Sequence, residues 1–158
     1  MKWMSPSPRS VQARRPASAT DRVLDARAAR SAIMRSVPSK DTGIERTVRR
    51  AVHAAGFRFA THRRDMPGAP DLAFPRYRVV LFVHGCFWHG HGCPRGSRIP
   101  RTNTDYWVQK VARNRARDAR STRRLRRQGW SVWTVWECRL ASGTARVIRA
   151  LEAKRSPD

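Results

Sequence analysis

The sequence predicts an α/β sandwich, in which helices flank a mixed central β-sheet. Helical and strand patterns follow one another in the order helix, strands, helix, strand, helix, an order typical of helices packed on the faces of a sheet. The run VVLFV at residues 79–83 is apolar on both faces, as expected of a strand in the middle of a sheet. The 158 residues suffice for one domain with a single core.

Residues 1–36 are predicted to form a basic, flexible N-terminal arm, ahead of a folded domain at residues 37–158. The arm mixes Pro6, Pro8 and Pro16 with Ser, Ala and Arg and shows no sustained apolar period. Within it, residues 22–34 are a candidate short helix.

The first helix of the folded domain is predicted to begin at Thr42. Thr42 and Glu45 have the spacing of a capping box, and Gly56 ends the helix. The apolar positions on one helical face are Ile44, Val48, Ala51, Val52 and Ala55. Beyond the helix, Phe57 and Phe59 alternate with polar residues in a strand pattern.

Two strands are predicted on either side of a turn at residues 75–77. Pro67, Gly68 and Pro70 break the chain before the first of them, the short apolar run 72–74. The second is the buried run 79–83, which leads directly to His84.

A long basic helix is predicted over residues 105–128, a stretch without Pro or Gly. Trp107, Val111, Asn114 and Asp118 recur there at helical spacing until Gly129 ends the helix. Residues 130–136 then form a strand with large side chains on both faces. A last helix is indicated by Val147, Ile148 and Leu151.

The charge of the chain points to an anionic partner. Lys and Arg number 34 against 11 Asp and Glu, a formal charge of +23, which a compact fold tolerates poorly without such a partner. Nucleic acid is the obvious candidate, although Arg richness equally follows from genome base composition. Because no apolar run is long enough for a membrane span or a secretory peptide, we expect a soluble, cytoplasmic protein with no membrane partner.

The segment HGCFWHGHGC at residues 84–93 carries two of the three cysteines and three of the five histidines. Cys86, Cys93, Cys138 and one histidine together make the four S and N donors of a tetrahedral zinc site. His91 is the favoured histidine because it lies closest to Cys93, which leaves the other two for chemistry. The alternative is that the cysteines are merely small buried residues beside a solvated loop.

Six ordered segments support a resemblance to a known family: MRSVPSKDTGIE, PGAPD, HGCFWHGHGC, TDYW, NRARD and GWSVWTVWEC. Through them, residues 33 to about 140 resemble the very short patch repair (Vsr) DNA mismatch endonucleases. The resemblance implies a restriction-endonuclease-like fold with a structural zinc site. It also implies nicking of one strand at the T of a T:G mismatch, with catalytic Mg²⁺.

The resemblance also implies roles for individual residues. The structural zinc falls to Cys86, His91, Cys93 and Cys138. Magnesium falls to Asp71 and the backbone carbonyl of Val83. The catalytic residues become Asp71, His84, His89, Asp118 and Glu45. An aromatic wedge that enters the base stack and binds DNA becomes Phe87, Trp88 and Trp107.

Elementary chemistry agrees with these assignments. Asp71 follows a Pro-Gly-Ala-Pro turn into a strand that pairs with the one ending at His84, although it is otherwise an ordinary turn residue. Imidazole side chains suit proton transfer, which makes His84 and His89 candidates for it, and Asp118 suits their orientation. The family usually has Thr where Val83 stands, so a carbonyl ligand survives the change but a hydroxyl contribution does not.

Partners and rival functions follow from the same features. We expect double-stranded DNA with a T:G mismatch as the substrate, mismatch-repair proteins as further candidate partners, and a monomer that is associated with the bacterial nucleoid when bound to DNA. One rival is a non-enzymatic zinc-containing DNA-binding module, and another is a restriction-like nuclease of different specificity. For the aromatic residues, the rival reading is that they only cover the zinc site and the core.

Overall fold

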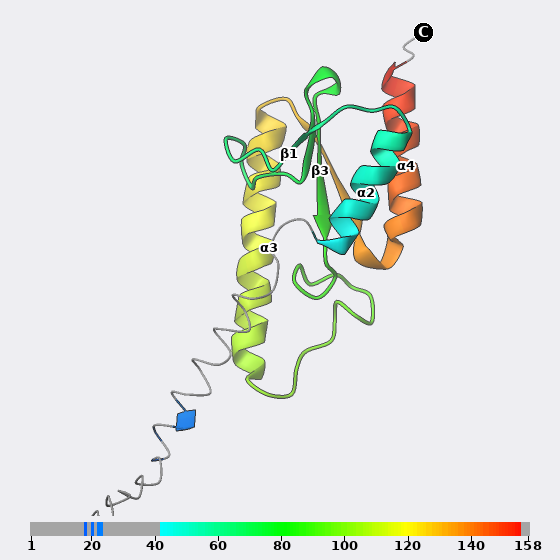
Figure 1. Cartoon of the computed structure of the whole chain (residues 1–158). Coiled ribbons are helices and arrows are strands. Elements are labelled where there is room, and N and C mark those ends of the chain that lie inside the picture. Colours follow the sequence, from blue (N-terminus) through cyan, green and yellow to red (C-terminus); the bar gives the residue numbers. More distant parts are fainter. Residues whose placement is uncertain (1–17, 19, 21, 24–41, 156–158) are drawn as a thin grey trace, which may run out of the picture. The chain divides into compact units, whose positions relative to one another are not determined.

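The computed structural model describes residues 18, 20, 22–23 and 42–155 (Figure 1). The predicted arm, including the candidate helix at 22–34, lies almost entirely outside the described residues. Among the described helices, none is long and apolar enough to cross a membrane.

Three helices flank a four-stranded sheet in the described domain. The helices are α2 (Gly43–Ala54), α3 (Thr104–Arg127) and α4 (Leu140–Arg155). The strands are β1 (Ala60–Thr61), β2 (Leu72–Phe74), β3 (Val79–His84) and β4 (Ser131–Trp136). Two short 3₁₀ helices, η1 (Pro75–Tyr77) and η2 (Glu137–Arg139), follow β2 and β4.

The sheet is mixed, as predicted. Its order is β1-β2-β3-β4, in which β1–β2 and β2–β3 pair antiparallel and β3–β4 pair parallel. Figure 1 shows α3 on one side of the sheet and α2 with α4 on the other. The central position of β3 accounts for the apolar run that the sequence places there.

The core lies on both faces of the sheet. On the α2 and α4 face, Val48, Val52, Val147 and Leu151 pack against alternate residues of β2 and β3. On the α3 face, the buried cluster contains Met66, Ala73, Val80 and Leu125. Because both faces of β2 and β3 are covered, these two strands lose the polar alternation of a surface sheet.

The first helix confirms its predicted cap. The Thr42 hydroxyl oxygen accepts a hydrogen bond from the Glu45 backbone N–H at 3.4 Å, and the hydroxyl donates to Glu45 Oε1 at 2.8 Å. Glu45 is therefore held at the first turn of α2, buried against the sheet.

The strand indicated at residues 57–59 is wrong in position, because β1 begins only at Ala60. The Phe57 N–H donates to the Val52 carbonyl, which ties this residue to the end of α2. The Phe57 ring is fully buried against Tyr77, with the ring centroids 5.9 Å apart. The alternation of Phe57 and Phe59 thus reflects burial in a helix-to-strand connection and not sheet pairing.

Candidate active site and metal centre

The parallel pairing of β3 with β4 brings the distant Cys138 to the Cys/His loop. His84 lies opposite Trp136 in the register, so Cys86 and Cys138 each follow two residues beyond the same pair. The Cys138 N–H donates to Cys86 Sγ at 3.4 Å. Cys86 and Cys138 are therefore far apart in the sequence but in contact in the fold, because the β3–β4 register places them side by side.

Four donors form a compact Cys/His centre on this edge of the sheet. The ligand atoms of Cys86, His91, Cys93 and Cys138 all lie within 4.8 Å of one another. His91 Nδ1 is 3.5 Å from Cys138 Sγ. Three sulfurs and one imidazole nitrogen are the donors of a structural zinc site, and this set is the one that the sequence predicts.

The thiols of the centre differ in acidity. A hydrogen bond with His91 lowers the pKa of Cys93 to about 6, whereas burial raises the pKa of Cys86 to about 11. Thiolates are the metal-binding form of cysteine. The lowered pKa of Cys93 favours its thiolate without a metal, whereas the thiolate of Cys86 would form only with a bound cation. The donor chemistry and the spacing both fit zinc.

Close backbone approaches hold the Cys/His loop in place. A Cβ on Gly96 would lie 2.1 Å from the His91 carbonyl oxygen, and one on Gly90 would lie 2.6 Å from Val111 of α3. Asn114 Nδ2 of α3 donates to the Trp88 carbonyl at 2.9 Å. The loop is thereby fixed against the helix that carries Asp118.

Two histidines and an acid form a second cluster beside the Cys/His centre. The rings of His84 and His89 stack with their centroids 3.7 Å apart and their planes 4° apart. His89 Nδ1 lies 2.5 Å from Asp118 Oδ2, and Arg117 lies 3.6 Å from the other oxygen of this carboxylate. Asp118 therefore lies in position to orient His89, and it also contacts the neighbouring Arg117.

The electrostatics of this cluster separate its members. Burial and the positive charge of His89 lower the pKa of His84 to about 4. Burial acts to raise the pKa of Asp118, but the hydrogen bond and charge of His89 outweigh it and hold that pKa below its ordinary value. His84 is therefore neutral at physiological pH, beside a carboxylate that holds His89.

A third cluster contains Asp71, the residue proposed from the sequence as the magnesium ligand. Asp71 Oδ2 accepts a hydrogen bond from the Val83 N–H at 2.7 Å. Its carboxylate groups with Glu45 and His62, and their ligand atoms lie within 4.8 Å of one another. Burial and the charge of Glu45 raise the pKa of Asp71 to about 6, against the lowering effect of its hydrogen bond to Val83.

The predicted catalytic residues therefore fall into two groups joined by β3. Glu45 and Asp71 form an acid centre with His62, and His84 forms a separate group with His89 and Asp118. The Val83 N–H contacts Asp71 of the acid centre, and the next residue of β3 is His84, so the two groups meet β3 at consecutive residues. Oxygen donors close together in the acid centre fit a divalent cation.

The aromatic residues predicted as a wedge form one cluster. The Phe87 ring centroid lies 5.1 Å from that of Trp88 and 5.4 Å from that of Trp107. Tyr106, which is half exposed, packs on Trp107 at 5.1 Å. The Cys/His loop and the start of α3 thus present a continuous aromatic surface.

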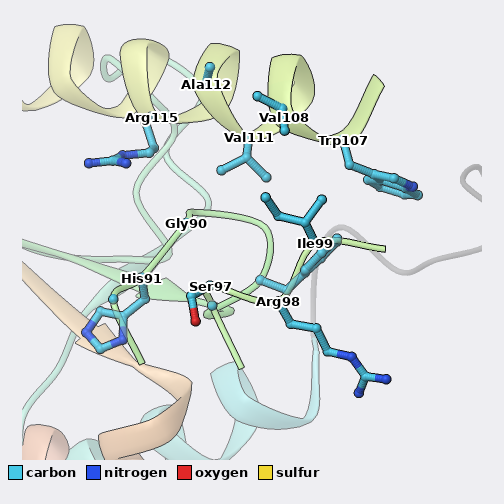
Figure 2. A pocket seen from close by; sticks show the side chains of 13 residues that line it. Gly90, His91, Ser97, Arg98, Ile99, Trp107, Val108, Val111, Ala112 and Arg115 are labelled. Atoms are coloured by element: carbon cyan, nitrogen blue, oxygen red, sulfur yellow. The ribbon is translucent and has the colours of Figure 1, made fainter. Parts of the chain in front are cut away.

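A cleft of about 360 Å³ lies between this loop and α3 (Figure 2). Figure 2 shows Ile99 facing Val108 and Val111 of the helix, while the side chains of Arg98 and Arg115 lie at its margins. Phe87 and Trp107 line the same cleft. It is separate from the acid centre, since none of its lining residues belongs to that group.

Sequence reasoning missed three residues that contact the site. His62 joins the acid centre, and Trp136 packs on both His84 and His91, with centroid distances of 5.2 and 4.4 Å. Glu137 accepts from the Cys86 N–H at 3.2 Å and from Arg95 at 2.7 Å. Strand register is the signal that locates all three, because each lies at or one residue beyond a strand end.

The raised pKa of Asp71 predicts a pH-dependent stability in magnesium-free buffer. Since its folded pKa of about 6 exceeds the ordinary value of 3.8, the wild-type chain should lose about 2 to 3 kcal/mol of unfolding free energy as pH rises from about 4 to about 6. Asp71→Asn should lack this loss. Chemical denaturation of both proteins across that range measures the difference. If the unfolding free energies of the two proteins change with pH in the same way, Asp71 does not have a raised pKa.

Comparisons with known proteins show which family the chain belongs to. The family model for DNA mismatch endonuclease Vsr matches residues 22–95. The type II nicking enzyme V.XorIIP of Xanthomonas oryzae is 48% identical over 135 residues, which cover 85% of this chain and 93% of that protein. The type II nicking enzyme V.NmeAIP of Neisseria meningitidis is 40% identical over 111 residues, covering 70% of this chain and 79% of that protein.

The DNA mismatch endonuclease Vsr of Escherichia coli is 40% identical over 94 residues, covering 60% of each chain. These relatives and the family match confirm the resemblance on which the sequence analysis relied. The non-enzymatic zinc module is set aside as an alternative because the relatives are endonucleases. The chain belongs to the DNA mismatch endonuclease Vsr family and is an endodeoxyribonuclease.

Proposed function

We propose that the chain nicks duplex DNA on the thymine strand of a T:G mismatch, in very short patch repair. The observation that carries this proposal is the arrangement around the end of β3, where an acid centre, a histidine pair and an aromatic cluster lie on consecutive or contacting segments. Cutting and mismatch recognition then share one DNA segment.

The acid centre is proposed to hold the catalytic Mg²⁺, with Asp71 and the Val83 backbone carbonyl as ligands and Glu45 beside them. The Asp71 hydrogen bond to the Val83 N–H fixes the carboxylate relative to the backbone of β3. Magnesium bound there would neutralise charge on the scissile phosphate. Because Val83 contributes only backbone atoms, the absence of the family's usual Thr leaves this arrangement intact.

The histidine pair is proposed to carry the proton transfers. Asp118 holds His89 through Nδ1, which leaves the opposite ring nitrogen to face a water or the leaving oxygen. His84 stacks on His89 and follows Val83 directly. The two stacked rings therefore connect the end of β3 to the Cys/His loop.

The Cys/His centre is proposed to hold a structural Zn²⁺ that shapes the loop. Cys86, His91 and Cys93 lie on that loop, and Cys138 anchors it to the end of β4. Zinc would thus fix the positions of His89 and the aromatic residues between the ligands. The mixed sheet with flanking helices also supports the proposal of a core like that of restriction endonucleases.

Duplex DNA is proposed to bind along the basic surface of α3. Eight exposed arginines lie along this helix: Arg113, Arg115, Arg117, Arg120, Arg123, Arg124, Arg126 and Arg127. Arginine forks bind phosphates, which position the duplex without reading its sequence. A restriction-like nuclease of different specificity is the competing proposal. It differs from ours in the preference for a mismatch, which in our proposal the aromatic cluster supplies.

The wedge proposal predicts a specific loss of discrimination in Trp107→Ala. A stacked aromatic ring is worth about 1 to 3 kcal/mol, so the preference for a T:G duplex over a paired one should fall about tenfold to a hundredfold. Binding and nicking of both duplexes measure the change, and Trp130→Ala is the control because Trp130 packs on the core of the α3 face, outside the aromatic cluster. Equal loss on both duplexes would make Trp107 a packing residue.

Strand mapping tests the proposed function. We expect Mg²⁺-dependent cleavage of a duplex labelled on either strand to give one product, from the thymine strand, with the guanine strand intact. Chelation of magnesium should stop the cut. Cleavage of both strands, or a cut away from the mismatch, would support the competing nuclease and overturn the proposal.

A further inference from the structure

His62 lies opposite Asp71 at the end of the β1–β2 hairpin. The antiparallel register pairs Ala60 with Ala73 and Thr61 with Leu72, so His62 directly follows, and Asp71 directly precedes, the last pair of this ladder. The loop of residues 63–70, which contains Pro67 and Gly68, closes this hairpin. The topology thus carries a histidine to the proposed magnesium ligand from a separate strand.

The contacts of His62 place its ring in the acid centre. His62 Nε2 lies 3.9 Å from Glu45 Oε2, and the side chains of the two residues are 19% and 6% exposed. Each of Glu45, His62 and Asp71 offers a ligand atom within 4.8 Å of the others. Arg49, one turn along α2, lies 3.3 Å from Glu45 and supplies positive charge from the helix side.

The backbone of His62 is unusual in a way that serves this placement. Its φ angle of 47° is in the left-handed region, where residues other than Gly are uncommon. Such a conformation costs free energy and persists when surrounding contacts impose it. Since β1 ends at Thr61, the left-handed residue turns the chain out of the strand at the point where its ring meets the two carboxylates.

The donor set differs from one built for Mg²⁺ alone. Mg²⁺ favours oxygen ligands and keeps several waters, whereas Mn²⁺ and later first-row ions accept an imidazole nitrogen together with carboxylates. Two carboxylates and one imidazole therefore make a mixed centre. Such a centre accepts Mg²⁺ through its oxygens and gains an additional ligand when the ion is Mn²⁺.

We propose that His62 is a ligand of the metal held by Asp71 and Glu45, and that it makes this centre bind Mn²⁺ more tightly than Mg²⁺. The inference rests on the proposed function, because it takes the acid centre as the catalytic metal site. It adds a nitrogen ligand and a metal preference to that site.

Metal binding by the full-length, zinc-loaded chain without DNA tests the inference. Mn²⁺ affinity is measured by electron paramagnetic resonance, and Mg²⁺ affinity by competition. In His62→Gln, we expect Mn²⁺ affinity to fall at least about tenfold and Mg²⁺ affinity to fall much less. His53→Gln is the matched control, since His53 is exposed on α2 and contacts Arg58.

Pulsed measurements on the bound Mn²⁺ separate a ligand from a neighbour. A directly bound imidazole gives a ¹⁴N coupling, which should be present in the wild type and in His53→Gln and absent in His62→Gln. His62→Asn is a second variant, since Asn tolerates the left-handed backbone. Thermal melting and zinc content identify the variant that retains the fold.

Two outcomes overturn the inference. In a folded variant, unchanged Mn²⁺ affinity or a persistent ¹⁴N coupling would show that His62 is not a ligand. Asp71→Asn distinguishes this failure from failure of the proposed function: if it abolishes Mn²⁺ binding while the His62 variants bind normally, only the His62 inference fails. If Asp71→Asn binds Mn²⁺ like the wild type, the metal centre itself is wrongly placed.

Discussion

Replacing Asp71 by Ala should abolish nicking while leaving binding to a T:G duplex largely intact. The Asp71 carboxylate is the group that accepts the Val83 N–H and shares the acid centre with Glu45. Its removal takes away a metal ligand but no contact with the bases. We expect the single-turnover rate to fall at least about a thousandfold, and binding without metal to tighten because a negative charge near phosphate is lost.

Asp65→Ala is the matched control for this experiment. Asp65 is an exposed acid of the same hairpin loop, and its carboxylate pairs with Arg63 at 2.7 Å. Its loss should leave the nicking rate within about twofold, as is usual for an exposed ion pair. If an Asp71→Ala protein cuts at near the wild-type rate in Mg²⁺, the acid centre is not the catalytic metal site.

Replacing Cys138 by Ala should cost the chain both its zinc and its fold. Cys138 is the one donor of the Cys/His centre that comes from outside the loop, and it connects that loop to β4. Structural zinc contributes about 10 to 16 kcal/mol in small zinc domains, which is comparable to the whole stability of a domain. We expect less than stoichiometric zinc by elemental analysis and a melting transition lowered by more than about 10 °C.

Cys138→His is the control that keeps a donor at this position. Imidazole also binds zinc, so this variant should recover a large part of the zinc content that Cys138→Ala loses. One zinc per chain is expected in the wild type. A folded wild type without stoichiometric zinc, or an alanine variant with unchanged zinc and melting temperature, would refute the centre.

The sequence predicts the elements whose local signals agree with the tertiary structure. The cap of α2 at Thr42, the Gly129 stop after α3 and the apolar run of β3 are local signals, and each is confirmed. The strand pattern of Phe57 and Phe59 fails because burial against Tyr77 and Phe74 gives the same alternation without sheet pairing.

The site divides along the same line. The Cys/His loop is recognisable because its cysteines and histidines are concentrated in a short segment, and Asp71 because it follows the Pro-Gly-Ala-Pro turn within a family motif. His62 is not, since only the β1–β2 register brings it to Asp71. The two groups likewise meet β3 at consecutive residues, because Asp71 contacts the backbone of Val83 and the His84 ring stacks on His89.

The nicking rate on matched and mismatched duplexes tests whether the chain cuts at a T:G mismatch. Three duplexes of one sequence have T:G, C:G or T:A at the same position. Each is labelled on the strand that carries the first-named base and is mixed with excess zinc-loaded chain in Mg²⁺. We expect the T:G duplex to be cut at least about a hundredfold faster than either paired duplex. Equal rates on the three duplexes, or no cut of the T:G strand, would contradict it.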